Sequence, residues 1–270
     1  MGSQTLTLAQ LIISVGCGAL VLVALRASCQ ECVFPSMGIA SRAQFLDTAV
    51  LAAAFTGGFV TLNACLTSMH VSLVMVLRAA EPLTTLAIGF AFFGTRVPRA
   101  KAAVLLVVVA GCALSAVGPF SINAGGLALA LLSNVAFSLR GLLGKRLSTC
   151  YGGGDVETFF QLCWLGALLQ AGLLLATTGT AAFASIAHTL AASSANVRLT
   201  LVNGVMFYSY LCLSWVCLGR MSAVSHSVAN SLRRPVTVIA ALFYAPVALT
   251  GTNCAGIVLA CAAAAIYGLM

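Results

Sequence analysis

The stretch Val-Ser-Leu-Val-Met-Val-Leu-Arg-Ala-Ala-Glu-Pro, residues 71–82, has a weak counterpart in Val-Ser-His-Ser-Val-Ala-Asn-Ser-Leu-Arg-Arg-Pro, residues 224–235. In both stretches arginine lies shortly before a proline, and an apolar half-span, a short turn and one further apolar segment follow. Proline removes the backbone hydrogen bond to the carbonyl four residues earlier. Each stretch is therefore predicted to be a helix that kinks beside its arginines.

The composition around these stretches is that of a membrane protein. Of the 270 residues 61% are hydrophobic and 7% are charged, whereas soluble domains carry about 25% charged residues. This excludes an ordinary soluble enzyme and a disordered chain. The formal net charge of +8 comes from 13 Lys+Arg and 5 Asp+Glu scattered between apolar runs, so no patch for nucleic acid is expected. The runs are continuous rather than alternating, which excludes a β-barrel.

About nine runs approach the roughly 20 apolar residues that a membrane-spanning helix needs. We therefore predict an all-α, polytopic membrane protein with about nine transmembrane helices. The stretch Gly179–Arg198 is too polar to span and is suited to a short interfacial helix. The predicted spans are Thr5–Arg26, Phe45–Thr67, Val71–Gly94, Ala100–Gly118, Gly125–Leu147, Thr158–Thr178, Leu199–Leu218, Ala223–Val247 and Cys254–Met270.

The loop charges predict an orientation. One side holds eight loop cations and the other holds only Arg198, so the positive-inside rule makes the first side cytosolic, or stromal in a plastid. The C-terminus is then on that side and the N-terminus is not, as expected if a ten-helix arrangement lacks its first helix. The eight cations are Arg26, Arg42, Arg96, Arg99, Lys101, Lys145, Arg146 and Arg220.

The two proline-containing helices then run in opposite directions, which is the pattern of an inverted-repeat transporter with its site at the midplane. The chain reads as one transporter domain, 1–270, made of half-repeats 1–122 and 123–270.

Four arginines lie at membrane depth: Arg78, Arg140, Arg233 and Arg234. Each costs about 2.5–3.5 kcal/mol at a helix centre, and arginine cannot lose its proton. Only Glu81, three residues after Arg78, is a nearby counter-charge. The arrangement predicts a water-filled cavity visited by an anion, since guanidinium groups fit phosphate and carboxylate oxygens. Two simpler readings remain open: Arg140 snorkels toward the cytosolic end, or Arg78 only pairs with Glu81.

Other polar side chains extend this candidate site. His226, Asn230 and Arg233 are spaced by four and three residues, so they line one stripe of a helix; His226 has a simple packing role as its alternative. The 11 cysteines are mostly inside predicted spans and read as small packing residues. The pair Cys29 and Cys32 has no second pair beside it, so no metal site is predicted.

Three motifs resemble the triose-phosphate translocator family of the drug/metabolite transporter superfamily. They are Arg-Ala-Ala-Glu-Pro at 78–82, Asn-Val-Ala-Phe-Ser-Leu-Arg at 134–140 with Lys145-Arg146, and Met-Ser-Ala-Val-Ser-His-Ser-Val-Ala-Asn-Ser-Leu-Arg-Arg at 221–234. The resemblance covers essentially the whole chain. It implies ten helices in two inverted halves, and the first span here resembles the family's second.

The resemblance also implies roles for single residues. Arg78 stands where the family has a lysine, and Arg233 and Arg234 stand on its Lys-Arg pair. Tyr210 falls on a substrate-contacting tyrosine and Arg140 on a helix arginine. Thr61 and Asn63 fall near polar positions, while Phe59 replaces a family histidine and Pro235 is not the usual residue.

The expected function is an antiporter that exchanges inorganic phosphate for a phosphorylated metabolite (triose phosphate, phosphoenolpyruvate or sugar phosphate) by alternating access, without catalytic residues, cofactor or metal. The partners are that substrate, phosphate and the lipid bilayer. The plastid inner envelope is the favoured membrane. The alternatives are a Golgi or ER nucleotide-sugar transporter, an enzyme acting on lipid phosphates within the membrane, for which acid/base groups are lacking, and a transport-dead remnant.

Overall fold

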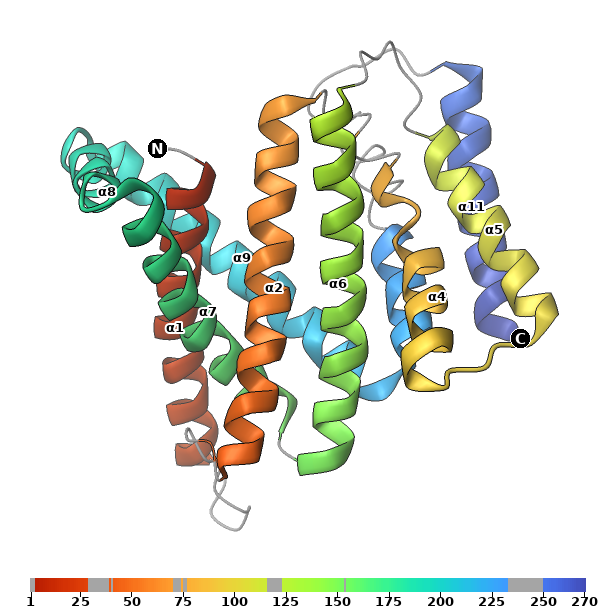
Figure 1. Cartoon of the computed structure of the whole chain (residues 1–270), viewed down its shortest axis with the longest axis horizontal. Helices are drawn as coiled ribbons and strands as arrows, with labels where there is room; N and C mark the ends of the chain where they lie inside the picture. The colour runs from red at the N-terminus through yellow and green to blue at the C-terminus, as the bar shows by residue number, and fades with distance from the viewer. Residues whose placement is uncertain are drawn as a thin grey trace. The chain divides into compact units, whose positions relative to one another are not determined.

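The computed structural model describes residues 3–28, 39, 41–69, 74, 77–115, 123–152, 154–232 and 250–270. Every element with defined ends in these ranges is an α-helix, which confirms the all-α prediction (Figure 1). Residues 223–232 are helical as well. The helices are α1 Ser3–Ser28, α2 Arg42–Ser68, α4 Glu81–Phe93, α5 Arg99–Leu114, α6 Ala124–Tyr151, α7 Asp155–Thr178, α8 Ala181–Ala191, α9 Ser194–Arg220 and α11 Gly251–Leu269.

Five helices in the described ranges are long and apolar enough to cross a membrane: α1, α2, α6, α7 and α9. Five of the nine predicted spans are thus long continuous helices. Helices α4 and α11 are apolar but shorter. The stretch set apart as too polar to span contains the 11-residue helix α8, as expected, and α9 begins five residues earlier than predicted.

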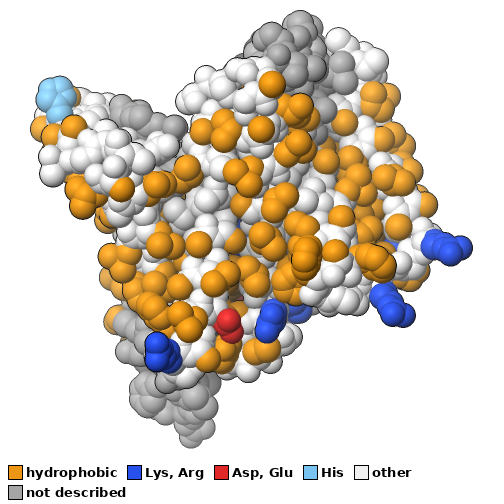
Figure 2. All heavy atoms as spheres, in the orientation of Figure 1, with side chains coloured by type: hydrophobic (Ala, Val, Ile, Leu, Met, Phe, Trp, Pro, Cys, Tyr) orange, Lys and Arg blue, Asp and Glu red, His pale blue; other side chains and the backbone are white. Residues whose placement is uncertain are grey.

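The outer surface of these helices is apolar. Figure 2 shows hydrophobic side chains spread over the face drawn, with few charged ones among them. Large apolar side chains are well exposed, among them Leu20 at 72%, Phe92 at 81% and Leu213 at 67%. Soluble proteins rarely expose large contiguous apolar patches. In a membrane protein these side chains face lipid.

The chain divides into two compact units, and the first consists of Met1–Val60 and Leu143–Arg220. In it α1 packs along both α7 and α9 (Figure 1). Phe159 lies between two aromatic rings of α9, with ring centroids 5.7 Å from Tyr208 and 6.2 Å from Trp215.

Contacts at one end of this unit join several helix ends that carry loop cations. The Lys145 ammonium at the end of α6 donates to the Gly219 carbonyl at the end of α9, at 2.7 Å. The Tyr151 hydroxyl donates to Asp47 near the start of α2, at 2.8 Å. The loop cations of α2, α6 and α9 therefore lie at the same end of the unit, as the orientation argument requires.

The second unit consists of Thr61–Leu142 and Met221–Met270. In it α5 and α11 lie side by side (Figure 1). A Cβ atom on Gly111 would lie 2.5 Å from the Ala260 backbone nitrogen, and one on Gly256 would collide with the Ser115 backbone. Small residues thus let the two backbones approach closely, as is common between membrane helices.

The two helices α5 and α11 run antiparallel. The Asn253 amide near the start of α11 donates to the Ser115 carbonyl after the end of α5, at 3.1 Å. At the other end the Lys101 ammonium lies 5.5 Å from the Tyr267 ring centroid. The C-terminal end therefore lies beside the loop cation Lys101, which agrees with the predicted topology.

The compact units do not follow the predicted half-repeats, because each unit takes segments from both 1–122 and 123–270. Compactness measures packing, whereas a repeat is defined by chain order and symmetry. The division into half-repeats stays a prediction.

Candidate functional site

The site lies in the second unit, where the chain breaks its helical path just before α4. Residues Ala79 and Ala80 form a turn, and α4 begins at Glu81 with Pro82 in its first turn. Proline is tolerated there because the first backbone N–H groups of a helix have no intrahelical acceptor. The predicted kink beside Arg78 is thus a break between helices.

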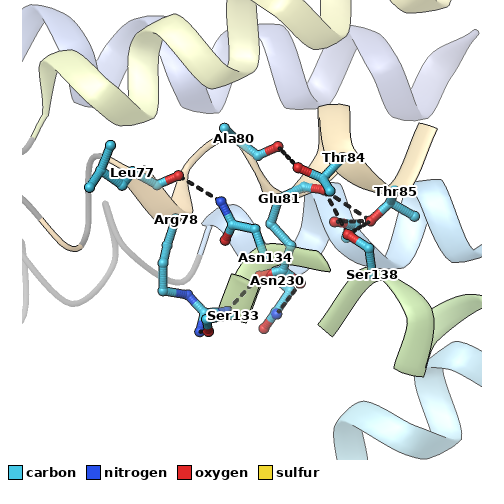
Figure 3. Close-up of polar contacts among 11 residues, drawn as sticks. Leu77, Arg78, Ala80, Glu81, Thr84, Thr85, Ser133, Asn134, Ser138 and Asn230 are labelled. Carbon is cyan, nitrogen blue, oxygen red and sulfur yellow. Dashed lines mark hydrogen bonds and ion pairs between the residues drawn. The ribbon is translucent and has the colours of Figure 1, made fainter. Parts of the chain in front are cut away.

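Side chains of α6 donate hydrogen bonds to backbone carbonyls on both sides of this break (Figure 3). The Asn134 amide donates to the Leu77 carbonyl at 2.9 Å, and the Ser138 hydroxyl donates to the Glu81 carbonyl at 3.3 Å. Buried backbone carbonyls need such partners, because an unsatisfied one is costly away from water. Polar residues of α6 therefore stabilise the backbone that positions Arg78.

Arg78 is buried, with 4% of its surface exposed, and has three partners. Its Nη2 lies 2.7 Å from the Oε2 of Glu81, and its Nη1 donates to the Ser133 hydroxyl at 3.2 Å (Figure 3). Its guanidinium carbon lies 4.4 Å from the centre of the Phe137 ring, within cation–π range. The two hydrogen bonds use two of the five N–H donors that an arginine carries.

Glu81 connects the two motif helices. It is 4% exposed, and its second carboxylate oxygen lies 3.5 Å from the amide nitrogen of Asn230. One turn further along α4 the Thr85 hydroxyl lies 3.3 Å from that of Ser227. Residue numbers rise along α4 while those of its partners fall, so the two motif helices run in opposite directions, as predicted.

Arg140 reaches the same aromatic ring from α6. It is 5% exposed, and its guanidinium carbon lies 5.5 Å from the centre of the Phe137 ring. Because Arg140 is buried, its side chain does not extend to water at the helix end, which argues against snorkelling. Two guanidinium groups and one carboxylate thus gather around Phe137, and this local surplus of positive charge suits an anion.

The remaining predicted residues are distributed as follows. His226 is buried one turn before Asn230, and Thr61 is half-buried on α2 in the same unit. Tyr210 belongs to α9 in the other unit, and 38% of its surface is exposed. Arg233 and Arg234, and with them Pro235, lie outside the described residues.

Sequence reasoning assigned no role in this cluster to Ser133, Phe137, Ser138 or Thr85. A signal was present, because Ser133, Phe137 and Arg140 are spaced by four and three residues and share one stripe of α6.

Phe59, which stands where the family has a histidine, packs in an aromatic cluster of the first unit. Its ring lies 5.1 Å from that of Phe55 and 5.2 Å from that of Phe207.

Buried arginines inside apolar, lipid-facing helices define the class: a multi-pass membrane protein with an interior site suited to an anion. The chain belongs to the triose-phosphate transporter family, whose model matches residues 4–268. This is a family of transporters and not of enzymes.

Similar proteins point the same way. Phosphoenolpyruvate/phosphate translocator 3, chloroplastic, of Oryza sativa subsp. japonica is 30% identical over 223 residues, covering 80% of this chain and 56% of that protein. Phosphoenolpyruvate/phosphate translocator 1, chloroplastic, of Arabidopsis thaliana is 25% identical over 230 residues, covering 84% and 56%. Glucose-6-phosphate/phosphate translocator 2, chloroplastic, of Arabidopsis thaliana is 23% identical over 220 residues, covering 81% and 55%. The chain thus spans about half the length of the curated relatives it matches.

A solved crystal structure shares the fold. It is 15% identical and aligns over 100% of this chain and 89% of that chain, with a TM-score of 0.74. At this identity the likeness concerns the fold alone.

Proposed function

We propose that the chain is an antiporter that exchanges inorganic phosphate for a phosphorylated metabolite by alternating access, in the plastid inner envelope. The observation that carries this proposal is the pair of buried arginines, Arg78 and Arg140, around Phe137 with Glu81 as their nearby carboxylate. The names of the similar proteins, which pair a phosphorylated metabolite with phosphate, support the choice of cargo.

Glu81 acts as an internal anion in the empty site. Its carboxylate takes one edge of the Arg78 guanidinium at 2.7 Å, where a phosphate oxygen would otherwise bind. A phosphate carries more charge than a carboxylate and offers more acceptor oxygens, so it competes well for a guanidinium. Binding of the substrate moves the carboxylate away from Arg78 or shares the donors with it. Until the substrate binds, Asn230 contacts Glu81 and Ser133 contacts Arg78.

Two further arginines, which we place from the sequence alone, complete the proposed site. Arg233 and Arg234 follow Asn230 on the second motif, and we assign them to the phosphate, with Arg78 closing from the first motif. Tyr210, Thr61 and His226 orient the rest of the substrate. In this proposal the chain contributes nine spans of an inverted-repeat arrangement with halves 1–122 and 123–270.

Exchange follows from electrostatics. In this proposal the site without substrate holds four arginines, two of them assigned by sequence, against one glutamate, and a surplus of buried positive charge is costly at membrane depth. A bound anion reduces that surplus and so permits the two halves to rock around the site. Transport without a return substrate is therefore disfavoured.

Uptake of labelled phosphate into liposomes containing the purified chain tests the proposal. Uptake is expected only when the liposomes contain phosphate or a phosphorylated three- to six-carbon metabolite. Arg78→Gln is expected to raise the KM for phosphate by about 10- to 100-fold, because hydrogen bonds to charged groups contribute about 1.5–3 kcal/mol. Arg198→Gln, on an exposed part of α9, is the matched control and should leave the KM unchanged.

Two results would overturn the assignment. Uptake that survives Arg233→Ala combined with Arg234→Ala would separate transport from the arginine site. Uptake of a labelled nucleotide sugar that is driven by an internal nucleoside monophosphate, but not by internal phosphate, would identify a nucleotide-sugar transporter of the Golgi or ER instead.

A further inference from the structure

A cavity of about 220 Å³ lies in the first unit between α2 and α6. It is at the end where the loop cations of that unit gather. The cavity combines three polar side chains with an apolar floor. The polar ones are Asp47, Arg146 and Tyr151, and the apolar ones are Val50, Leu143 and Leu147.

Two opposite charges line this cavity, Asp47 on α2 and Arg146 on α6. Asp47 accepts a hydrogen bond from the Tyr151 hydroxyl at 2.8 Å, which fixes the carboxylate at the cavity wall. Among the described residues no ion pair joins Asp47 to Arg146. A carboxylate on α2 and a guanidinium on α6, facing one cavity, suit a ligand that carries both an ammonium group and a phosphate.

The surroundings indicate where such a ligand comes from. Helices α2 and α6 are both long enough to span a membrane, and the cavity lies at their ends. Val50 of the lining and Leu46, one helical turn before it on α2, are 57% and 56% exposed. Exposed apolar side chains beside a polar cavity at a membrane boundary suit a molecule with a polar head and acyl chains.

We propose that this cavity binds the headgroup of a zwitterionic phospholipid on the cytosolic or stromal side. Its phosphodiester contacts Arg146, its ammonium group contacts Asp47, and its acyl chains lie against Leu46 and Val50. Tyr151 is a positioning residue that holds the carboxylate. The site is independent of the proposed exchange, since it requires only that α2 and α6 cross a membrane.

Lipid retention measures this site directly. The purified full chain is reconstituted into nanodiscs of phosphatidylethanolamine and phosphatidylglycerol in equal amounts, with identical acyl chains. The protein is then extracted with detergent and the retained lipids are quantified by mass spectrometry. Phosphatidylethanolamine should be enriched, because only this lipid offers an ammonium group to Asp47.

Variants test whether the cavity causes the preference for phosphatidylethanolamine. Asp47→Asn should lower the ratio of retained phosphatidylethanolamine to phosphatidylglycerol by about two- to fivefold, the range for an exposed ion pair. Arg146→Gln should reduce retention of both lipids. Tyr151→Phe keeps both charges and should lower the ratio less; it also serves if Asp47→Asn fails to fold. Arg220→Gln, a loop cation on α9 outside the cavity lining, is the matched control and should change nothing.

Three results would overturn the proposal. The first is equal or stronger retention of phosphatidylglycerol by the unaltered chain, which indicates simple attraction of anionic lipid to loop cations. The second is an unchanged lipid ratio in both Asp47→Asn and Tyr151→Phe. The third is displacement of retained lipid by an equal concentration of glycerophosphoethanolamine, which indicates a soluble ligand without acyl chains.

Discussion

Replacing Glu81 by glutamine separates a transport site from a merely structural ion pair. The glutamate and Arg78 are each 5% exposed in their side chains and 2.7 Å apart. Breaking a buried pair by removing one charge costs about 3–5 kcal/mol. Glutamine keeps the size of the side chain and one acceptor oxygen, and a neutral hydrogen bond retains about 1 kcal/mol. We therefore expect a loss of about 3 kcal/mol in the absence of ligand.

The assay is thermal unfolding of the detergent-purified chain with and without phosphate. At about 3 °C per kcal/mol, the midpoint of Glu81→Gln should fall by roughly 9 °C without phosphate. Phosphate at about 100 times its Kd for Glu81→Gln stabilises that variant by about 2.7 kcal/mol, so it should recover most of this loss. At the same phosphate concentration the unaltered chain should gain less, since phosphate must first displace the Glu81 carboxylate from Arg78.

The result that would refute this reasoning is a destabilised Glu81→Gln whose midpoint phosphate does not raise more than that of the unaltered chain. Arg78 and Glu81 would then be a structural pair and nothing more. Glu157→Gln, which removes the same charge near the start of α7, is the matched control. Its midpoint should respond to phosphate as that of the unaltered chain does.

Three further outcomes are expected. Phe137→Leu removes the ring shared by Arg78 and Arg140, so the KM for phosphate in liposome exchange should rise about three- to tenfold; Phe137→Tyr should stay near the original value, and an equal rise would count against the cation–π contacts. Gly111→Val should lower the monodisperse fraction in gel filtration because its side chain meets the Ala260 backbone; Gly172→Val, with open space around it, should not, and equal behaviour would contradict the close packing. In single-cysteine variants, a membrane-impermeant thiol reagent should label Cys150 and Cys254, both exposed, from opposite sides of the membrane; labelling from one side would contradict the topology.

Much of the fold could be predicted from single side chains and run lengths. A continuous apolar run must satisfy its own backbone hydrogen bonds in lipid, which makes it a helix, so α1, α2, α6, α7 and α9 were predictable. Pro82 predicted a kink, since proline lacks the N–H that a continuous helix needs. The turn at Ala79 and Ala80 was not predictable from Pro82 alone, and Asn134 and Ser138 of α6 donate to the carbonyls on either side of it.

Part of the candidate site was likewise predictable from the sequence, and part was not. The sequence by itself predicted that Arg78 and Arg140 lie at membrane depth, because the cost of a charge there depends on position along an apolar run. It also determined that the motifs around Glu81 and Asn230 run in opposite directions, because loop charges set the side of each helix end.

Only the tertiary structure decided which side chains of other helices reach these charges. It brought Arg78 to the Phe137 ring beside Arg140, and placed Glu81 between Arg78 and Asn230. Helical spacing gives the stripe on which a side chain lies but not the neighbour that the stripe faces. That neighbour is set by how the helices pack, which depends on close contacts such as Gly111 against Ala260.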